Sequence, residues 1–144
     1  MFLLGAAVSA VMLAAAVETP VVVVEDADSP VKIGRATVIT VAGDPPVLLY
    51  AATNQTDNDL EQFMLMVFMF DAKGILRTEQ IAPGRRTLQA KSTKYSAMVL
   101  DADTLDPAGY IVIGVNQAQR IDSGAWWRAE LRPAAEAAVL KKKP

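Results

Sequence analysis

The sequence predicts an all-β fold, an antiparallel β-sandwich of about seven or eight short strands followed by one short C-terminal helix. Three observations lead to this class: turn signals recur at short intervals, apolar and polar residues alternate with a period of two, and no long amphipathic segment separates the expected strands. Because parallel strands need helical crossovers, a doubly wound α/β fold is not expected. With 144 residues, the chain has room for one domain.

The first element is an apolar run over residues 1–16 without a charged side chain. It is shorter than a membrane-spanning helix, which needs ~20 apolar residues, and it ends in small residues, with Ala14 and Ala16 at the positions of a small-x-small cleavage site. This pattern predicts an export signal cleaved before Val17, although no basic residue follows Met1. The alternatives are an uncleaved N-terminal anchor, which would attach the protein to a membrane, and a buried N-terminal helix.

Residues 17–30 combine a β-branched run with an acidic stretch, which predicts a leader strand or linker. Residues 31–132 form the expected β-sandwich domain, because turn signals divide them into short alternating segments. The turn signals are Gly43 to Pro46, Asn54 to Asp59, Asp71 to Gly74, Pro83-Gly84 and Asp106 to Gly109. The segments between them include strands expected over 47–54, 60–70, 95–100, 111–120 and 126–131.

Residues 133–144 predict a short helix and a basic tail. Pro133 suits the first position of a helix, and residues 134–140 are rich in helix formers. Lys141 to Lys143 complement the helix dipole at its C-terminal end. A helix of this length is marginal alone and must dock against the domain to be stable.

Composition excludes several classes of function. The chain has no cysteine and no histidine, which removes thiolate and imidazole nucleophiles and sulfur-ligated metals. The net charge of −2 gives no general basic surface, so nucleic acid is not an expected partner. Asp101 and Asp103 have the carboxylate density of a calcium site or of a glycoside-cleaving pair, but their sequence favours a solvated turn. We expect no enzyme activity, no metal and no cofactor.

The segment 60–70 is apolar on both of its expected faces. Met64 and Met66 share one face with Phe68 and Phe70, whereas Met69 lies on the other. Only two thioethers converge on that face, without a histidine, so core filling is favoured over copper binding. One face fills the sandwich, and the face with Met64 and Met66 must be covered by the N-terminal strand, by the C-terminal helix, by a partner or by a second copy.

The expected last strand presents two adjacent tryptophans, which must point to opposite faces. Trp127 is assigned to the core, which leaves Trp126 on the polar face beside Arg128. An aromatic ring among amides and charges is typical of peptide or glycan recognition, although an arginine stem or the helix could also cover such a ring. The candidate binding residues are Trp126, Arg128, Asn116, Gln117 and Gln119, followed by Met64 and Met66.

The residues 52–60 and 67–74 follow a recognisable pattern. An Asn-x-Thr-Asp turn follows one strand, and a second strand ends in an aromatic residue and Asp71 before the Gly74 hairpin. This pattern resembles FxLYD-type and related immunoglobulin-like domains of bacterial exported proteins, over about 30 residues of the chain. The resemblance implies an immunoglobulin-like sandwich outside the cytoplasm that serves as an accessory or binding domain without catalytic residues.

The sequence therefore predicts a non-enzymatic binding domain, periplasmic or secreted in a bacterium. Its expected partner is a protein of the cell envelope or a second copy of the chain. The main alternative is a carbohydrate- or polymer-binding module in which Trp126 is the stacking platform. A third alternative, an enzyme that uses only carboxylates, needs a cleft that a small sandwich without long loops offers poorly.

Overall fold

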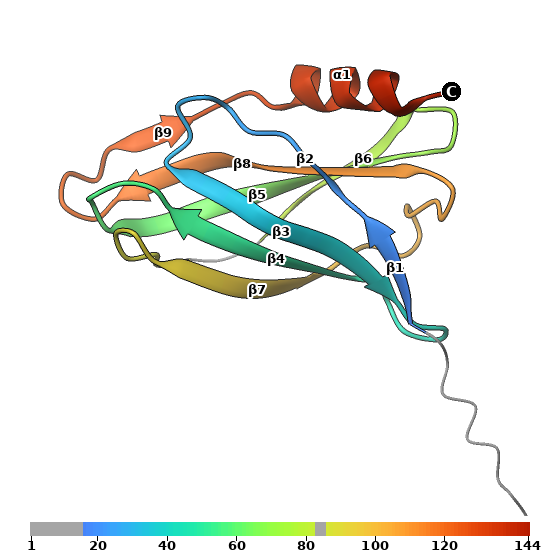
Figure 1. Ribbon diagram of the computed structural model, residues 1–144, viewed down its shortest axis with the longest axis horizontal. Helices are drawn as coiled ribbons and strands as arrows, with labels where there is room; N and C mark the ends of the chain where they lie inside the picture. Colours follow the sequence, from blue (N-terminus) through green and yellow to red (C-terminus); the bar gives the residue numbers. More distant parts are fainter. Residues whose placement is uncertain (1–15, 83–85) are drawn as a thin grey trace, which may run out of the picture.

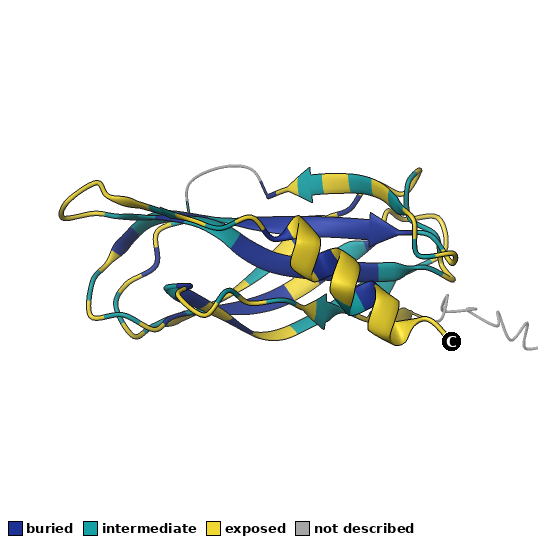
Figure 2. Cartoon of the chain, turned by 90° about the horizontal axis from the view of Figure 1, so that it is seen from above, coloured by how far each residue is buried: buried dark blue, intermediate teal, exposed yellow. Residues whose placement is uncertain are grey.

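The computed structural model describes residues 16–82 and 86–144. Within these ranges two β-sheets face each other, and one helix lies on the outer side of one sheet (Figure 1, Figure 2). The predicted all-β class with a short C-terminal helix is confirmed at this level. The expected export signal, apart from Ala16, and the expected turn at Pro83-Gly84 lie outside the described residues.

Each sheet combines strands from distant parts of the chain (Figure 1). The first sheet is antiparallel and has the order β1 (Val17–Pro20), β3 (Val31–Thr40), β4 (Val47–Asn54), β7 (Thr93–Val99). The second sheet has the order β2 (Val22–Val23), β8 (Tyr110–Arg120), β5 (Leu60–Phe70), β6 (Leu76–Ile81), and β9 (Trp126–Arg128) pairs with β8. The β2–β8 pair is parallel, and the helix α1 (Arg132–Lys142) ends the chain.

The strands follow the turn signals closely in the middle of the chain. β4 and β5 have the bounds expected from the sequence, and Gly74 takes a φ of 80° in the turn after β5. The segment 17–30, expected as a leader strand or linker, supplies β1 to the first sheet and β2 to the second. Residues 17–24 are therefore part of the sandwich in this structure.

The main core lies between the two sheets. Alternate residues of the long strands point inward, and the side chains of Leu48, Phe63, Leu65 and Ile113 are fully buried there. Asn54 is also fully buried at the end of β4, where its side chain holds the following loop. The inward-facing positions are thus accounted for by packing, and candidate binding residues belong to the outer faces.

The outer face of the second sheet carries a second apolar cluster. Phe68, Phe70 and Val112 pack there against Ala135 and Val139 of α1. This answers the question that the two-sided apolar pattern of β5 left open: the face is covered mainly by the C-terminal helix, with Val22 and Val24 beside it. Because a helix of this length is marginal in isolation, its contact with the sheet is what stabilises it.

The expected last strand is shorter than the alternation indicated. β9 ends at Arg128 instead of continuing to Leu131, and α1 begins at Arg132 with a proline in its first turn. Leu131 is buried in the cluster under the helix, whereas Trp127 packs against the main core. The prediction that these two side chains share one strand face was wrong, because the chain leaves the sheet to bury Leu131 beneath α1.

Candidate binding site

The helix covers only part of the outer face of the second sheet, and a group of polar and aromatic side chains occupies the remainder. Pairing across β5, β8 and β9 places these side chains in two rows: Gln62, Gln119 and Trp126 form one, and Met64, Gln117 and Arg128 form the other. Residues directly opposite each other in an antiparallel ladder share a face, so all six project from the same surface. We call these six residues the open patch.

Trp126 and Arg128 form the aromatic part of the open patch. The Arg128 guanidinium lies 4.8 Å from the centroid of the Trp126 ring, which is a cation–π contact. Trp126 is 36 % exposed, whereas Trp127 is half-buried against the main core, as their opposite directions along the strand require. The arginine covers one face of the ring, in line with one of the two environments expected from the sequence.

The glutamines of the open patch are ordered by hydrogen bonds between strands. The Gln62 amide Nε2 donates to Oε1 of Gln119 at 2.7 Å, and Nε2 of Gln119 donates to the carbonyl of Gly124 at 3.2 Å. Within the described part of the chain, the side chain of Gln117 makes no hydrogen bond and is half-exposed. The patch therefore offers both a fixed amide pair and an amide that remains available to a ligand.

Two predicted site residues lie outside the open patch. Met66 is 9 % exposed and packs in the cluster beneath α1, so it is not accessible to a partner. Asn116 lies at a register shift, where β8 holds an extra residue opposite Met64 and Leu65. Its carbonyl accepts the backbone N–H of Ala129 at 2.9 Å, and its buried Oδ1 has no partner among the described residues.

Gln62 was missed by the sequence reasoning although it belongs to the patch. It has the same parity along β5 as Met64, which is the signal that could have identified it. Which residue lies opposite Gln62 depends on the strand register, and the irregularities in β5–β8 pairing shift that register. The pairing of Gln62 with Gln119 therefore could not be identified from the sequence. Met64 is half-exposed and lies at the β5 end of the second row, next to Gln117.

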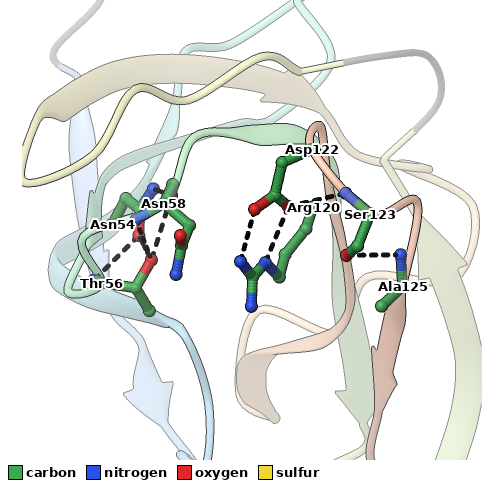
Figure 3. Close-up of polar contacts among 7 residues, drawn as sticks. All are labelled: Asn54, Thr56, Asn58, Arg120, Asp122, Ser123 and Ala125. Carbon is green, nitrogen blue, oxygen red and sulfur yellow. Dashed lines mark hydrogen bonds and ion pairs between the residues drawn. The ribbon is translucent and has the colours of Figure 1, made fainter.

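The turn between β8 and β9 leads directly into Trp126, and Figure 3 shows the polar contacts within this turn. Arg120 donates from Nε to a carboxylate oxygen of Asp122 at 2.9 Å and pairs with the other oxygen through Nη2. The hydrogen bonds from Arg120 hold the pKa of the Asp122 carboxyl below its ordinary value of 3.8, and the backbone N–H of Ser123 acts in the same direction. Gly124, with a φ of 67°, completes the turn.

The neighbouring loop contains the residues of the family resemblance, and their role here is structural (Figure 3). The Asn54 side chain donates to the carbonyls of Asn58 at 2.8 Å and Leu88 at 3.1 Å. Its Oδ1 accepts from the backbone N–H of Thr56 at 2.9 Å and from its hydroxyl at 2.7 Å. A hollow of about 200 Å³ lies between this loop and the two tryptophans. Leu60, Ala118 and Trp127, which pack with the main core, also line this hollow.

The remaining candidate from the sequence is the pair Asp101 and Asp103, considered as a calcium site or a glycoside-cleaving pair. Asp103 donates its backbone N–H to a carboxylate oxygen of Asp101 at 3.0 Å, so Asp101 serves the local turn. Over residues 16–82 and 86–144, no three histidine, cysteine or acidic side chains are grouped so that they could hold a metal ion. In the same ranges, no helix has the length and apolar character to cross a membrane.

The fold and the site together define a β-sandwich with an open surface of tryptophan, arginine and glutamine side chains. No protein-family model matches the chain, and comparisons with curated proteins and with solved structures give no match. The function is therefore argued from the geometry of the surface.

Proposed function

We propose that this protein is an immunoglobulin-like domain that acts by binding, and that the open patch contacts a protein partner. The connectivity supports the immunoglobulin-like class: β3, β4 and β7 lie in one sheet, and β9, β8, β5 and β6 lie in the other. The chain passes between the sheets after β4, after β6 and after β7, which is a Greek-key arrangement typical of such domains.

The observation that carries the proposal is the pairing of Trp126 and Arg128 on an uncovered face. Tryptophan and arginine are the side chains most enriched among residues that dominate the free energy of protein association. Here they stand beside half-exposed Met64 and the free amide of Gln117, while the apolar residues of the same face are covered by α1. Aromatic residues, methionine and arginine are the types that protein interfaces contain more often than the rest of the surface does.

The contact between Trp126 and Arg128 also ranks the two binding alternatives. A sugar ring stacks on a flat aromatic face, and the guanidinium at 4.8 Å already occupies one face of Trp126. A carbohydrate would have to use the other face or displace Arg128. A protein partner instead can use the exposed arginine and glutamines directly, so a protein is favoured over a glycan.

The proposal includes export, with a periplasmic or secreted location in a bacterium. The expected cleavage before Val17 coincides with the first residue of β1, so removal of residues 1–16 would leave every described strand intact. The measurement is the intact mass of the protein recovered from a bacterial host that expresses the full chain. Loss of residues 1–16 supports export, whereas a full-length protein in the cytosol contradicts it.

The binding function is tested by photo-crosslinking of the full chain in a bacterial host. A photoreactive residue at Gln117 should yield a defined crosslinked protein, and Arg128→Glu should abolish this product. The same residue at Ala137, on the exposed side of α1, is the matched control and should give none. A crosslink to the chain itself would identify the partner as a second copy.

Three results would contradict the proposal. The first is equal crosslinking from positions 117 and 137. The second is a Gln117 product that is unaffected by Arg128→Glu. The third is saturable quenching of tryptophan fluorescence by oligosaccharides that Trp126→Ala removes, because this result would favour the carbohydrate-binding alternative.

A further inference from the structure

The outer face of the first sheet holds a groove that is separate from the open patch. It has a volume of about 800 Å³ and runs across the middle of β3, β4 and β7. Small residues and larger ones alternate along it: Gly34, Ala51 and Ala97 lie beside Arg35, Leu49 and Tyr95. Ligand pockets for small molecules typically have volumes of ~300–1,000 Å³, so the groove has the size of a ligand site.

The groove is apolar, and the described chain does not fill it. Tyr95 is 80 % exposed and Leu49 is 38 % exposed, although these side chains project from neighbouring strands. A methyl group added at Gly34 would meet no atom within 4 Å, which confirms open space at this end. On the second sheet the corresponding outer face is covered by α1, whereas here Leu49, Tyr95 and Ala97 are exposed.

The lining of the groove includes one charged side chain, that of Arg35. No acidic side chain of the described residues pairs with it. Lys32 lies on the same face of β3, since Lys32 pairs with Thr53 and Arg35 with Ala51 across β4. The groove continues past Arg35 to Val21 and Val23, so it combines an apolar lining with one cationic side chain that lacks a counter-charge.

We propose that this groove binds a single-chain carboxylate, a free fatty acid. Its acyl chain lies over the exposed Ala97, between Leu49 and Tyr95, and its carboxylate accepts hydrogen bonds from the Arg35 guanidinium. An arginine matches a carboxylate with two parallel donors, which gives both charge pairing and orientation. The basic C-terminal tail of the chain carries the same sign of charge as Arg35 and is not a suitable occupant.

The test is calorimetric titration of the full chain with dodecanoate, kept below the concentration at which it forms micelles. The expected result is one saturable site. Arg35→Gln should weaken binding about tenfold or more, because it removes a charge-assisted hydrogen bond. Gly34→Leu should abolish binding by filling the groove, and its thermal unfolding curve should match that of the wild-type protein. Lys141→Gln, which removes an exposed cation on α1, should bind like the wild-type protein.

A second titration uses dodecanol, which has the same chain length as dodecanoate but carries no charge. It should bind the wild-type protein more weakly than dodecanoate does, and Arg35→Gln should not weaken it further. If Gly34→Leu fails to fold, Tyr95→Ser replaces it as the variant that removes one side of the groove.

The proposal is overturned if the wild-type protein does not bind dodecanoate, or if Arg35→Gln and the groove variant bind it as the wild-type protein does. It is also overturned if sedimentation shows a dimer that Gly34→Leu dissociates, since the occupant is then a second copy. Binding to phosphatidylglycerol vesicles without binding to free dodecanoate would likewise reject it in favour of a membrane surface.

Discussion

The outer face of the second sheet has two halves built on the same two strands, and they differ in what covers them. In one half, Phe68, Phe70 and Val112 are buried beneath α1. In the other half, β5 and β8 contribute Met64 and Gln117 to the open patch. The difference shows that an apolar pattern along a strand does not identify a binding surface. The candidate binding surface is the part of this sheet face that α1 does not cover.

The largest expected effect comes from the covered half. Phe68→Ala removes a fully buried ring from the cluster under the helix and should lower the free energy of unfolding by about 4 kcal/mol, measured by urea denaturation. Trp126→Ala, which truncates the aromatic residue of the open patch, should lower it by less than about 1 kcal/mol. A loss of equal size for both variants would show that the open patch is as structural as the covered half.

The boundary between the halves gives the second prediction. A Cβ atom at Gly114 would lie 2.6 Å from the Val24 carbonyl oxygen and 2.7 Å from a methyl carbon of Leu131. Gly114→Ala must therefore displace the backbone at Val24, just after β2, and should cost about 2 kcal/mol of unfolding free energy. Gly34→Ala is the matched control, because nothing lies within 4 Å of its added Cβ. Equal melting temperatures for both variants would contradict the close approach.

A smaller effect is expected from Arg128→Ala in the open patch. Loss of the cation–π contact should reduce unfolding free energy by about 0.5–1 kcal/mol and should increase acrylamide quenching of tryptophan fluorescence. Arg77→Ala, which removes an exposed arginine of β6, should change neither quantity. Unchanged quenching in Arg128→Ala would show that the guanidinium does not shield Trp126.

The smallest effect is a pH dependence of the turn that precedes Trp126. Because the folded state holds the pKa of Asp122 below 3.8, its stabilising contribution is present above that pH and is lost as pH falls through the lowered value. Near-ultraviolet circular dichroism of the tryptophans should change in this range. Asp122→Asn should lack this transition, and an identical titration in the variant would assign it to another group.

Local patterns in the sequence predicted much of this structure. Polar loops and Gly74 define the bounds of β4 and β5, because turn chemistry depends on neighbouring residues alone. The opposite directions of Trp126 and Trp127 also follow from one strand's period. These features need no information about which strands meet, and they were predicted without it.

Features that depend on distant pairing were not predicted. The sequence could not decide whether α1, the N-terminal strand or a partner covers Phe68 and Phe70, because all three could bury the same area. The extra residue at Asn116 shifts the β8 register, so the alignment of Gln62 with Gln119 could not be derived from parity. The burial of Met66 and Leu131 under the helix is likewise a result of tertiary packing.

The parallel pairing of β2 with β8 has a consequence for the order of folding. Val22 pairs with Val112, so a strand near the start of the chain can form its ladder only after most of the sequence has been synthesised. Contacts between residues so far apart in sequence delay folding, because loop-closure entropy is lost before the contact stabilises the chain. β2 therefore joins the second sheet only after β8 has been synthesised, late in translation of the chain.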